Sequence, residues 1–157
     1  MVMEHPSVQR VAKQLRLLGA NGDIVQLADA ARTAAQAAEQ LGCSVGAIAN
    51  SLVFDAKNQP VFVMTSGAHR VDVGQLTALL EITPVKRADA DFVRLHTGMP
   101  IGGVAPVGHP SPLRTLVDVD LARYEQVWAA AGHPHTVFPT TYAELLRITG
   151  GSAAAVG

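Results

Sequence analysis

Two apolar segments in the first half of the chain constrain its fold more than any other feature. Residues 48–54 and 60–65 are rich in Val, Phe and Leu, and each has the length of a strand rather than of a helix. The residues between them, 55–59, include Asp, Lys and Asn and read as a turn. We therefore expect two antiparallel strands joined by a hairpin loop.

Helical patterns lie on both sides of this strand pair. Apolar residues at three- and four-residue spacing from Val8 to Leu18 predict an amphipathic helix that ends at Gly19. A capping residue precedes each of four further helical segments. These are residues 34–41 after Thr33, 73–80 after Asp72, a short segment between Asp89 and Gly98, and a last segment between Thr141 and Gly150.

The remaining elements are shorter. Strands are expected at residues 24–27, 83–86, 113–118 and 137–138, with a helical turn at 120–124. Residues 127–131 fit a strand or a helix equally well, and the tail, residues 152–157, is expected to fray. No repeat or linker divides the chain, so we expect one domain over residues 1–157 that mixes helices with strands.

Charge and cysteine content exclude several classes of protein. A net charge of −1 gives no global basic field, so any contact with nucleic acid must be local. One cysteine, Cys43, permits no internal disulfide, which suits a cytoplasmic setting, and its thiol is expected to be packing rather than a nucleophile. The chain lacks an apolar stretch of about 18 residues, so no membrane association is expected.

The segment from Gly98 to Pro112 holds four glycines and four prolines, a density that excludes regular structure. Glycines let backbone N–H groups approach a ligand, and prolines reduce the cost of holding the loop in one shape. Such a loop can form an oxyanion hole or an anion-binding site. A tight connection between two elements explains the same composition, and both readings stay open.

Other polar residues give weaker signals. Arg70 follows the second apolar strand and is either a phosphate contact or a solvated charge, while Asp72 is expected to cap a helix. The spacing of the histidines does not match a metal site, so none is expected. One histidine could instead hydrogen-bond a ribose or a leaving ester, although a surface or capping role is the commoner fate of a histidine. No serine lies in the setting of a catalytic triad.

Six segments, taken in order, resemble the YbaK and prolyl-tRNA-synthetase-associated domain family over residues 30–150. They are residues 33–42, 48–54, 63–67 and 70–72, the glycine-rich residues 97–106, and Asp118. The resemblance implies an α+β fold with a mixed, largely antiparallel, curved sheet that approaches a barrel and is surrounded by helices. It also implies an enzyme that hydrolyses, in trans, the ester joining a wrong amino acid to the terminal adenosine of tRNA.

The resemblance implies roles for particular residues. The Gly-x-x-x-Pro element, Gly102 to Pro106, would supply backbone amides that hold the aminoacyl carbonyl, while a ribose hydroxyl or a water attacks. No cofactor or metal is implied. The partners implied are the tRNA acceptor end and, beyond it, a synthetase or an elongation factor. The implied catalytic residues are Gly102, Gly103, Pro106 and Asn50, and the implied substrate-binding residues are Ser51, Ser66, Gly67, Arg70, His135 and Gly98.

One position departs from the family pattern. Many members carry a lysine where this chain has Asn50, and that lysine is understood to hold the phosphate or ribose. Asparagine brings no charge, so Arg70 or another cation would have to replace it. Two alternatives follow: a weak or inactive module that binds the aminoacyl end of tRNA, or a hydrolase of small aminoacyl esters. The sequence does not decide between His133 and His135, nor does it identify the amino acid, the tRNA or the oligomeric state.

Overall fold

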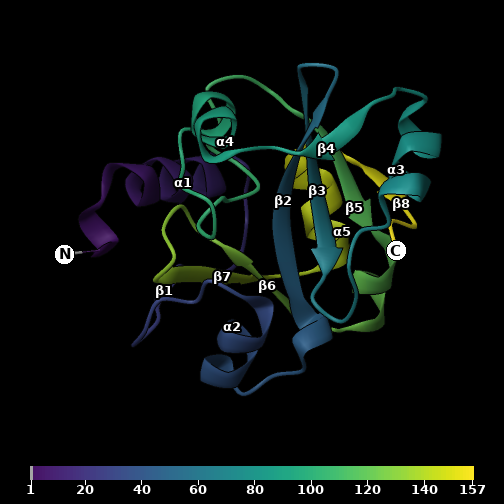
Figure 1. Cartoon of the computed structure of the whole chain (residues 1–157). Helices are drawn as coiled ribbons and strands as arrows, with labels where there is room; N and C mark the ends of the chain where they lie inside the picture. The colour runs from purple at the N-terminus through teal and green to yellow at the C-terminus, as the bar shows by residue number, and fades with distance from the viewer. Residues whose placement is uncertain (1) are drawn as a thin grey trace.

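A computed structural model describes residues 2–157 and shows one curved sheet with helices packed around it (Figure 1). The helices are α1 (Pro6–Leu17), α2 (Ala34–Leu41), α3 (Val73–Leu80), α4 (Ala90–Thr97) and α5 (Tyr142–Thr149), with short 3-10 turns η1 (Val2–Glu4), η2 (Val45–Ala47) and η3 (Val119–Arg123). The strands are β1 (Val25–Gln26), β2 (Ile48–Ala56), β3 (Gln59–Ser66), β4 (Val85–Arg87), β5 (Arg114–Asp118), β6 (Val127–Ala130), β7 (Thr136–Thr140) and β8 (Ser152–Ala154).

The sheet has the order β1-β7-β6-β2-β3-β5-β8, and β4 pairs with β2 beside this path. Four of the strand pairs are antiparallel and three are parallel. In Figure 1, β6 and β7 run across the direction of β2 and β3, which shows how strongly the sheet curves. The predicted α+β class with a mixed, curved sheet is therefore confirmed, and the predicted hairpin is the long β2–β3 pair.

One side of β2 is only partly paired. On that side β2 meets β6 at Ile48 and Ala49, and it meets β4 from Phe54 to Ala56. Between these two contacts no strand of the described chain covers residues 50–53, although the Ala88 N–H donates to the Val53 carbonyl at 3.1 Å. A gap therefore interrupts the sheet beside residues 50–52.

The alternation of side chains along β2 and β3 separates two cores. Ala49, Val53, Phe62 and Met64 face a core shared with α1, α4, α5 and the glycine-rich loop. The intervening residues, among them Phe54, face a second core closed by α3. A third, smaller cluster holds α2 against Ile48 of β2 and against β7.

The predicted helix caps are confirmed. Thr33, Asp72, Asp89 and Thr141 each accept, through a side-chain oxygen, the N–H of the residue three positions later. Residues 127–131, which fitted either element by pattern, contain strand β6. Among residues 2–157, no helix combines the length and apolar character that crossing a membrane requires.

The expectation that the tail frays is wrong. Ser152–Ala154 forms β8, which pairs in parallel with β5. Val156 is fully buried, and its carbonyl accepts the Asp72 N–H at 2.7 Å. The tail has few β-branched residues, so its strand depends on this pairing and burial rather than on local propensity.

Candidate functional site

Two cavities meet at the gap in the sheet beside β2. The smaller has a volume of about 50 Å³ and the larger of about 680 Å³. They are parts of one cleft, because the same residues form the wall between them. The residues that line both are Arg32, Thr33, Ala34, Asn50, Ser51, Gly102 and Val104.

The smaller cavity is a chamber with many short side chains on its walls, together with Trp128. Its apolar lining comes from α2, β2, β6 and β7, which converge beside the gap. The alanines among these residues are Ala31, Ala34, Ala37, Ala49, Ala129 and Ala130. Because a water molecule needs roughly 10–15 Å³ of such space, the chamber accepts only a few heavy atoms.

The larger cavity is a cleft with basic walls. Arg32, Arg70 and Arg87 line it from three different segments, and no acidic residue lines it. None of the three takes part in an ion pair within residues 2–157, and the Arg87 guanidinium lies 5.9 Å from the centre of the Phe54 ring. The cleft thus concentrates positive charge in a chain whose net charge is −1.

Ile101 of the glycine-rich loop lines the larger cleft, and two further residues of the loop, Gly102 and Val104, line both cavities. Within residues 2–157, neither of their N–H groups has a hydrogen-bond acceptor. The Gly102 φ of +90° is open to glycine and strained for other residues. These two unpaired amides therefore belong to residues that line the cleft.

The Gly103 amide does not remain available. Its N–H donates to the Pro100 carbonyl at 3.0 Å, and Gly103 lines neither cavity. A Cβ at this position would lie 2.8 Å from the Cα of His133. Gly103 therefore lets the loop pack against the backbone at His133, which replaces its expected role as an amide donor.

Buried contacts fix the shape of the loop behind Gly102. The His109 Nε2 lies 2.7 Å from the Ala105 carbonyl, and the His109 ring packs edge-on against Phe62. Burial lowers the pKa of His109, while the hydrogen bond to Ala105 opposes this shift. Pro106 is buried in the same turn and does not reach the cleft, which agrees with a shaping role.

Asn50 and Ser51 meet at the cleft although they are neighbours on one strand. Side chains of adjacent strand residues point to opposite faces, so both residues reach the cleft because it passes along the open side of β2. The Ser51 Oγ is buried and, within residues 2–157, has no hydrogen-bond partner. Asn50 is half-buried.

Four residues expected at the site lie elsewhere. The Ser66 hydroxyl is buried and donates to the Gly46 carbonyl at 2.8 Å. A Cβ on Gly67 would meet the Val45 carbonyl, so this glycine permits close packing of the chain, and Gly98 ends α4 at a φ of +73°. The fourth residue is His135, and none of the four lines either cavity.

His135 belongs instead to a histidine cluster beside the small chamber. The His133 ring centre lies 5.4 Å from those of both His5 and His135, and the His133 Nδ1 accepts the His135 N–H at 3.1 Å. The pKa of His133 is lowered by partial burial and by the nearby His5, His135 and Arg32. Neither His133 nor His135 lines the cleft, whereas Pro134 between them lines the chamber.

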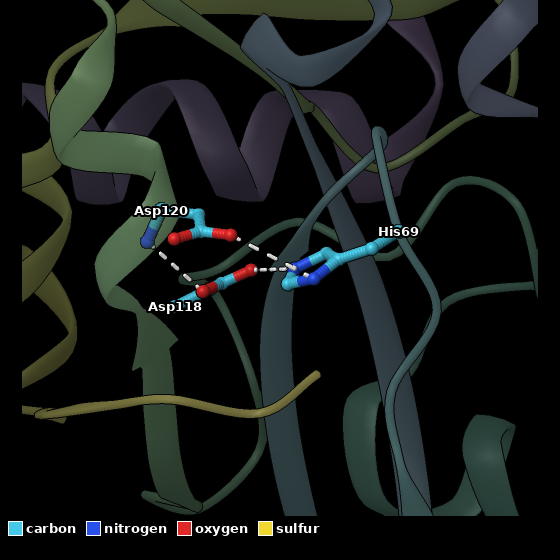
Figure 2. Close-up of side chains that lie close together, drawn as sticks. All are labelled: His69, Asp118 and Asp120. Atoms are coloured by element: carbon cyan, nitrogen blue, oxygen red, sulfur yellow. Dashed lines mark hydrogen bonds and ion pairs between the residues drawn. The ribbon is translucent and has the colours of Figure 1, made fainter.

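His69, which lines the cleft, lies against the carboxylates of Asp118 and Asp120 (Figure 2). The His69 Nε2 lies 2.5 Å from Asp118 Oδ2, and the His69 Nδ1 lies 3.7 Å from Asp120 Oδ2. Their ligand-type atoms lie within 4.8 Å of one another, as a metal site requires. Asp118 Oδ2 also accepts hydrogen bonds from the Ser66 N–H and the Thr65 hydroxyl. We interpret the group as one that orients His69 against the cleft.

The sequence therefore predicts part of the cleft and misses another part. Asn50, Ser51, Gly102 and Arg70 all lie in the lining of the cleft. Arg32, Arg87 and His69 were not singled out, although a cation was expected to replace the family lysine. An exposed arginine on a short segment has no local signal, so only the fold brings these residues to the site.

Comparisons with known proteins identify similar chains and a family. A crystal structure of a candidate trans-editing enzyme for prolyl-tRNA synthetase superimposes with a TM-score of 0.90 at 41% identity and covers 96% of each chain. A scaffold protein used for computational epitope grafting has a TM-score of 0.91 at 39% identity and covers 97% of each chain. The uncharacterized protein YwhH of Bacillus subtilis (strain 168) is 28% identical over 124 residues, 78% of both chains. The model of the aminoacyl-tRNA editing domain matches residues 28–148, and the chain belongs to that family.

Proposed function

We propose that this chain is a trans-editing deacylase that hydrolyses the ester of mischarged tRNA in the cytoplasm. One observation carries the proposal: the unpaired amides of the glycine-rich loop and the open side of β2 meet in a single basic cleft. The 3′ end of tRNA is an acyl ester on a chain of phosphates. The cleft offers N–H donors suited to the ester and arginines suited to the phosphates.

In this proposal the bound substrate occupies both cavities. The amino acid side chain enters the small chamber, and the adenosine and its neighbouring phosphates occupy the larger cleft. The Gly102 and Val104 N–H groups donate to the carbonyl oxygen as it gains negative charge. Removal of one such donor costs about 3–4 kcal/mol of transition-state stabilisation in other acyl-transfer enzymes.

In this proposal no side chain of the protein acts as the nucleophile. A water positioned in the cleft attacks the carbonyl carbon, the bond to the ribose oxygen breaks, and the proton that the water loses goes to that oxygen. A free ribose hydroxyl that attacks first only moves the acyl group between ribose oxygens, so water completes this route as well. Ser51, the serine at the cleft, has no hydrogen-bond partner within residues 2–157 that could act as its base. The chain therefore contributes binding, orientation and electrostatic stabilisation.

The arginines supply the charge that Asn50 lacks. The Cα of Arg32 lies 4.0 Å from where a Cβ on Gly102 would be, so the Arg32 backbone passes beside the loop that holds the ester. Arg70 and Arg87 line the cleft further from the chamber. An arginine can bind phosphate through two parallel hydrogen bonds, so these side chains can anchor the acceptor end without a lysine.

Deacylation of a panel of mischarged tRNAs tests the proposal directly. The panel pairs short side chains, such as alanyl and seryl groups, with longer ones, and it includes tRNA for proline because of the similar candidate editing enzyme. We expect the short aminoacyl groups to be removed faster, because the chamber excludes longer ones. If no ester in the panel is lost faster than in buffer, the deacylase proposal fails.

Asn50 favours one alternative, a module that binds aminoacyl-tRNA without turning it over. This alternative predicts that an amide-linked, non-hydrolysable aminoacyl-adenosine binds while the ester panel stays intact. It also predicts that Asn50→Lys gives activity that the wild-type chain lacks, so no gain in the lysine variant contradicts it. Cleavage of small aminoacyl esters in the absence of tRNA would point instead to a small-ester hydrolase.

A further inference from the structure

Ser51 adds further unpaired polar groups to the cleft wall, beside the amides of Gly102 and Val104. Along an antiparallel pair, the main-chain N–H and carbonyl of successive residues point alternately to the two sides of the strand. The Ile48 carbonyl accepts from Gly67 on the β3 side, and the Val53 carbonyl accepts from Ala88 on the opposite side. By this alternation, the N–H and carbonyl of Ser51 point away from β3.

That side of Ser51 is where the sheet is interrupted. β6 ends its pairing at Ala49 and β4 begins its pairing at Phe54, so within residues 2–157 no strand meets Ser51 there. Its main-chain donor and acceptor therefore face the cleft that Ser51 lines. An unpaired main-chain edge is a ready partner for the polar atoms of a ligand.

The Ser51 side chain adds a second unsatisfied group. Its Oγ is the one buried side-chain oxygen or nitrogen that finds no hydrogen-bond partner in the described part of the chain. Ser51 has the same parity along β2 as Ala49 and Val53, so its side chain points toward the core that contains Val104 of the glycine-rich loop. A buried hydroxyl without a partner is unfavourable in the free protein, and a ligand that bonds to it gains affinity.

We infer that Ser51 recognises the amino acid part of the substrate, with its main-chain carbonyl and hydroxyl accepting hydrogen bonds from the α-amino group. The inference rests on the proposed deacylase function and adds a specificity-determining residue to it. Ser51 lies between the small chamber and the larger cleft, and Gly102 lines the same boundary. An α-amino group is two bonds from the ester carbonyl carbon, so both can be held at this boundary at once.

The test compares an aminoacyl-tRNA that the wild type deacylates with its N-acetylated form, in wild type and in Ser51→Ala. We expect acetylation to lower kcat/KM of the wild type by about tenfold or more, since it removes the charge of the α-amino group and leaves one N–H where the two acceptors of Ser51 need two. Ser51→Ala should lower kcat/KM for the free amine by about tenfold and reduce the acetylation effect, because it removes the hydroxyl, one of the two acceptors that the α-amino group uses. Ser111→Ala, on an exposed loop outside both cavities, serves as the matched control.

The outcomes separate this inference from the deacylase proposal. If acetylation lowers kcat/KM equally in wild type and Ser51→Ala, the inference is overturned and the deacylase proposal stands. If the wild type cleaves no ester, the inference is tested by binding instead. Calorimetry then measures the affinity of wild type and Ser51→Ala for amide-linked aminoacyl-adenosine and for its N-acetylated form. Weaker binding of the free amine by Ser51→Ala, with no loss in the free energy of unfolding, supports the inference, and equal binding by both proteins overturns it.

Discussion

Each arginine of the cleft brings one positive charge, so its contribution to phosphate binding can be measured by replacing it alone. Arg32, Arg70 and Arg87 are exposed and line the cleft without an acidic neighbour in its lining. A protein side chain that neutralises one phosphate of a single strand changes the slope of log K against log salt by about 0.7. The salt dependence of binding therefore counts the arginines that contact phosphate.

Replacing each arginine by glutamine should weaken the binding of tRNA that carries no amino acid. It should also reduce the magnitude of the slope of log K against log salt by about 0.7 for each phosphate that the variant no longer neutralises. Fluorescence titration over a range of salt concentrations measures both quantities. Arg114→Gln, an exposed change outside both cavities, should leave the slope unaltered. A slope that stays the same in all three cleft variants would mean that the phosphates lie elsewhere.

Individual residues differ in how well the sequence predicts their roles. Asn50, Ser51 and Gly102 lie in segments with strong strand or loop patterns, so their place in the family order also gave their place in the cleft. Ser66 shows the limit of this reasoning. It lies one position before Gly67 at the end of β3, where a side chain can face either the cleft or the interior, and its hydroxyl faces the interior.

The glycine-rich loop is the element on which the reaction depends, and Gly103 tests its packing. Ala at this position would put a Cβ 2.8 Å from the backbone of His133, so the loop must move. We expect Gly103→Ala to lower the free energy of unfolding by about 1–3 kcal/mol, as overpacking does in other cores. We also expect a lower kcat, because the shift displaces Gly102.

Urea unfolding and deacylation assays measure these two effects. Gly19→Ala separates crowding from backbone strain, because Gly19 has a φ of +71° but no heavy atom near a Cβ. It should lose stability through its backbone conformation alone and keep its kcat. Full activity of Gly103→Ala would show that the loop does not need its close packing on His133.

Lowering the pH should reduce the stability of the protein, because His109 is buried behind the same loop. Burial lowers the pKa of His109 in the folded protein below its value of about 6.5 in the unfolded chain. Between these two values the unfolded chain binds more protons, so the free energy of unfolding rises with pH and falls as pH drops below about 6.5. His109→Gln keeps a donor for the Ala105 carbonyl and removes this titration.

Urea unfolding of both proteins from pH 7.5 to pH 5 isolates the contribution of His109. The wild type should lose more stability than His109→Gln over this range, and the difference should develop below about pH 6.5. The other histidines are common to both proteins, including His133, whose lowered pKa acts in the same direction. Parallel stability curves for the two proteins would contradict a role for His109.

At the scale of elements, the sequence predicts what depends on neighbouring residues. Helix caps and apolar spacing lie within a few positions of each other, and for this reason α2, α3, α4 and α5 were predicted with their caps. β8 was missed because residues 152–154, Ser-Ala-Ala, carry no strand pattern. Its conformation comes from pairing with β5, a contact distant in sequence.

The cleft is a property of the whole sheet. It exists because β6 and β4 each pair with β2 over only a few residues and leave residues 50–52 uncovered. No pattern within β2 indicates that residues 50–52 lack a neighbouring strand, since the residues of β2 have the pattern of an ordinary strand. The pairing of Ile48 with Trp128 joins residues about half the chain apart, which explains why the sequence suggested the residues of the site but not its architecture.

The C-terminal tail connects the far edge of the sheet to this cleft. Val156 is buried in the core beneath α3, and its carbonyl accepts the N–H of Asp72, the cap residue of α3. A Cβ on Gly157 would lie 3.0 Å from the His69 Nδ1, so the tail passes beside the segment that carries His69 and Arg70. Loss of packing here should therefore affect both stability and binding.

We expect Val156→Ala to lower the free energy of unfolding by about 2 kcal/mol, because it removes buried methyl groups and leaves a cavity behind. Truncation after Gly151 should cost more, because it also removes β8 and leaves the Asp72 N–H without its acceptor. Both variants should bind tRNA more weakly as Arg70 loses support, whereas Val45→Ala, at a site 38% exposed, should change little. A stable truncated chain with unchanged affinity would show that β8 is dispensable and that the cleft is held by the rest of the sheet.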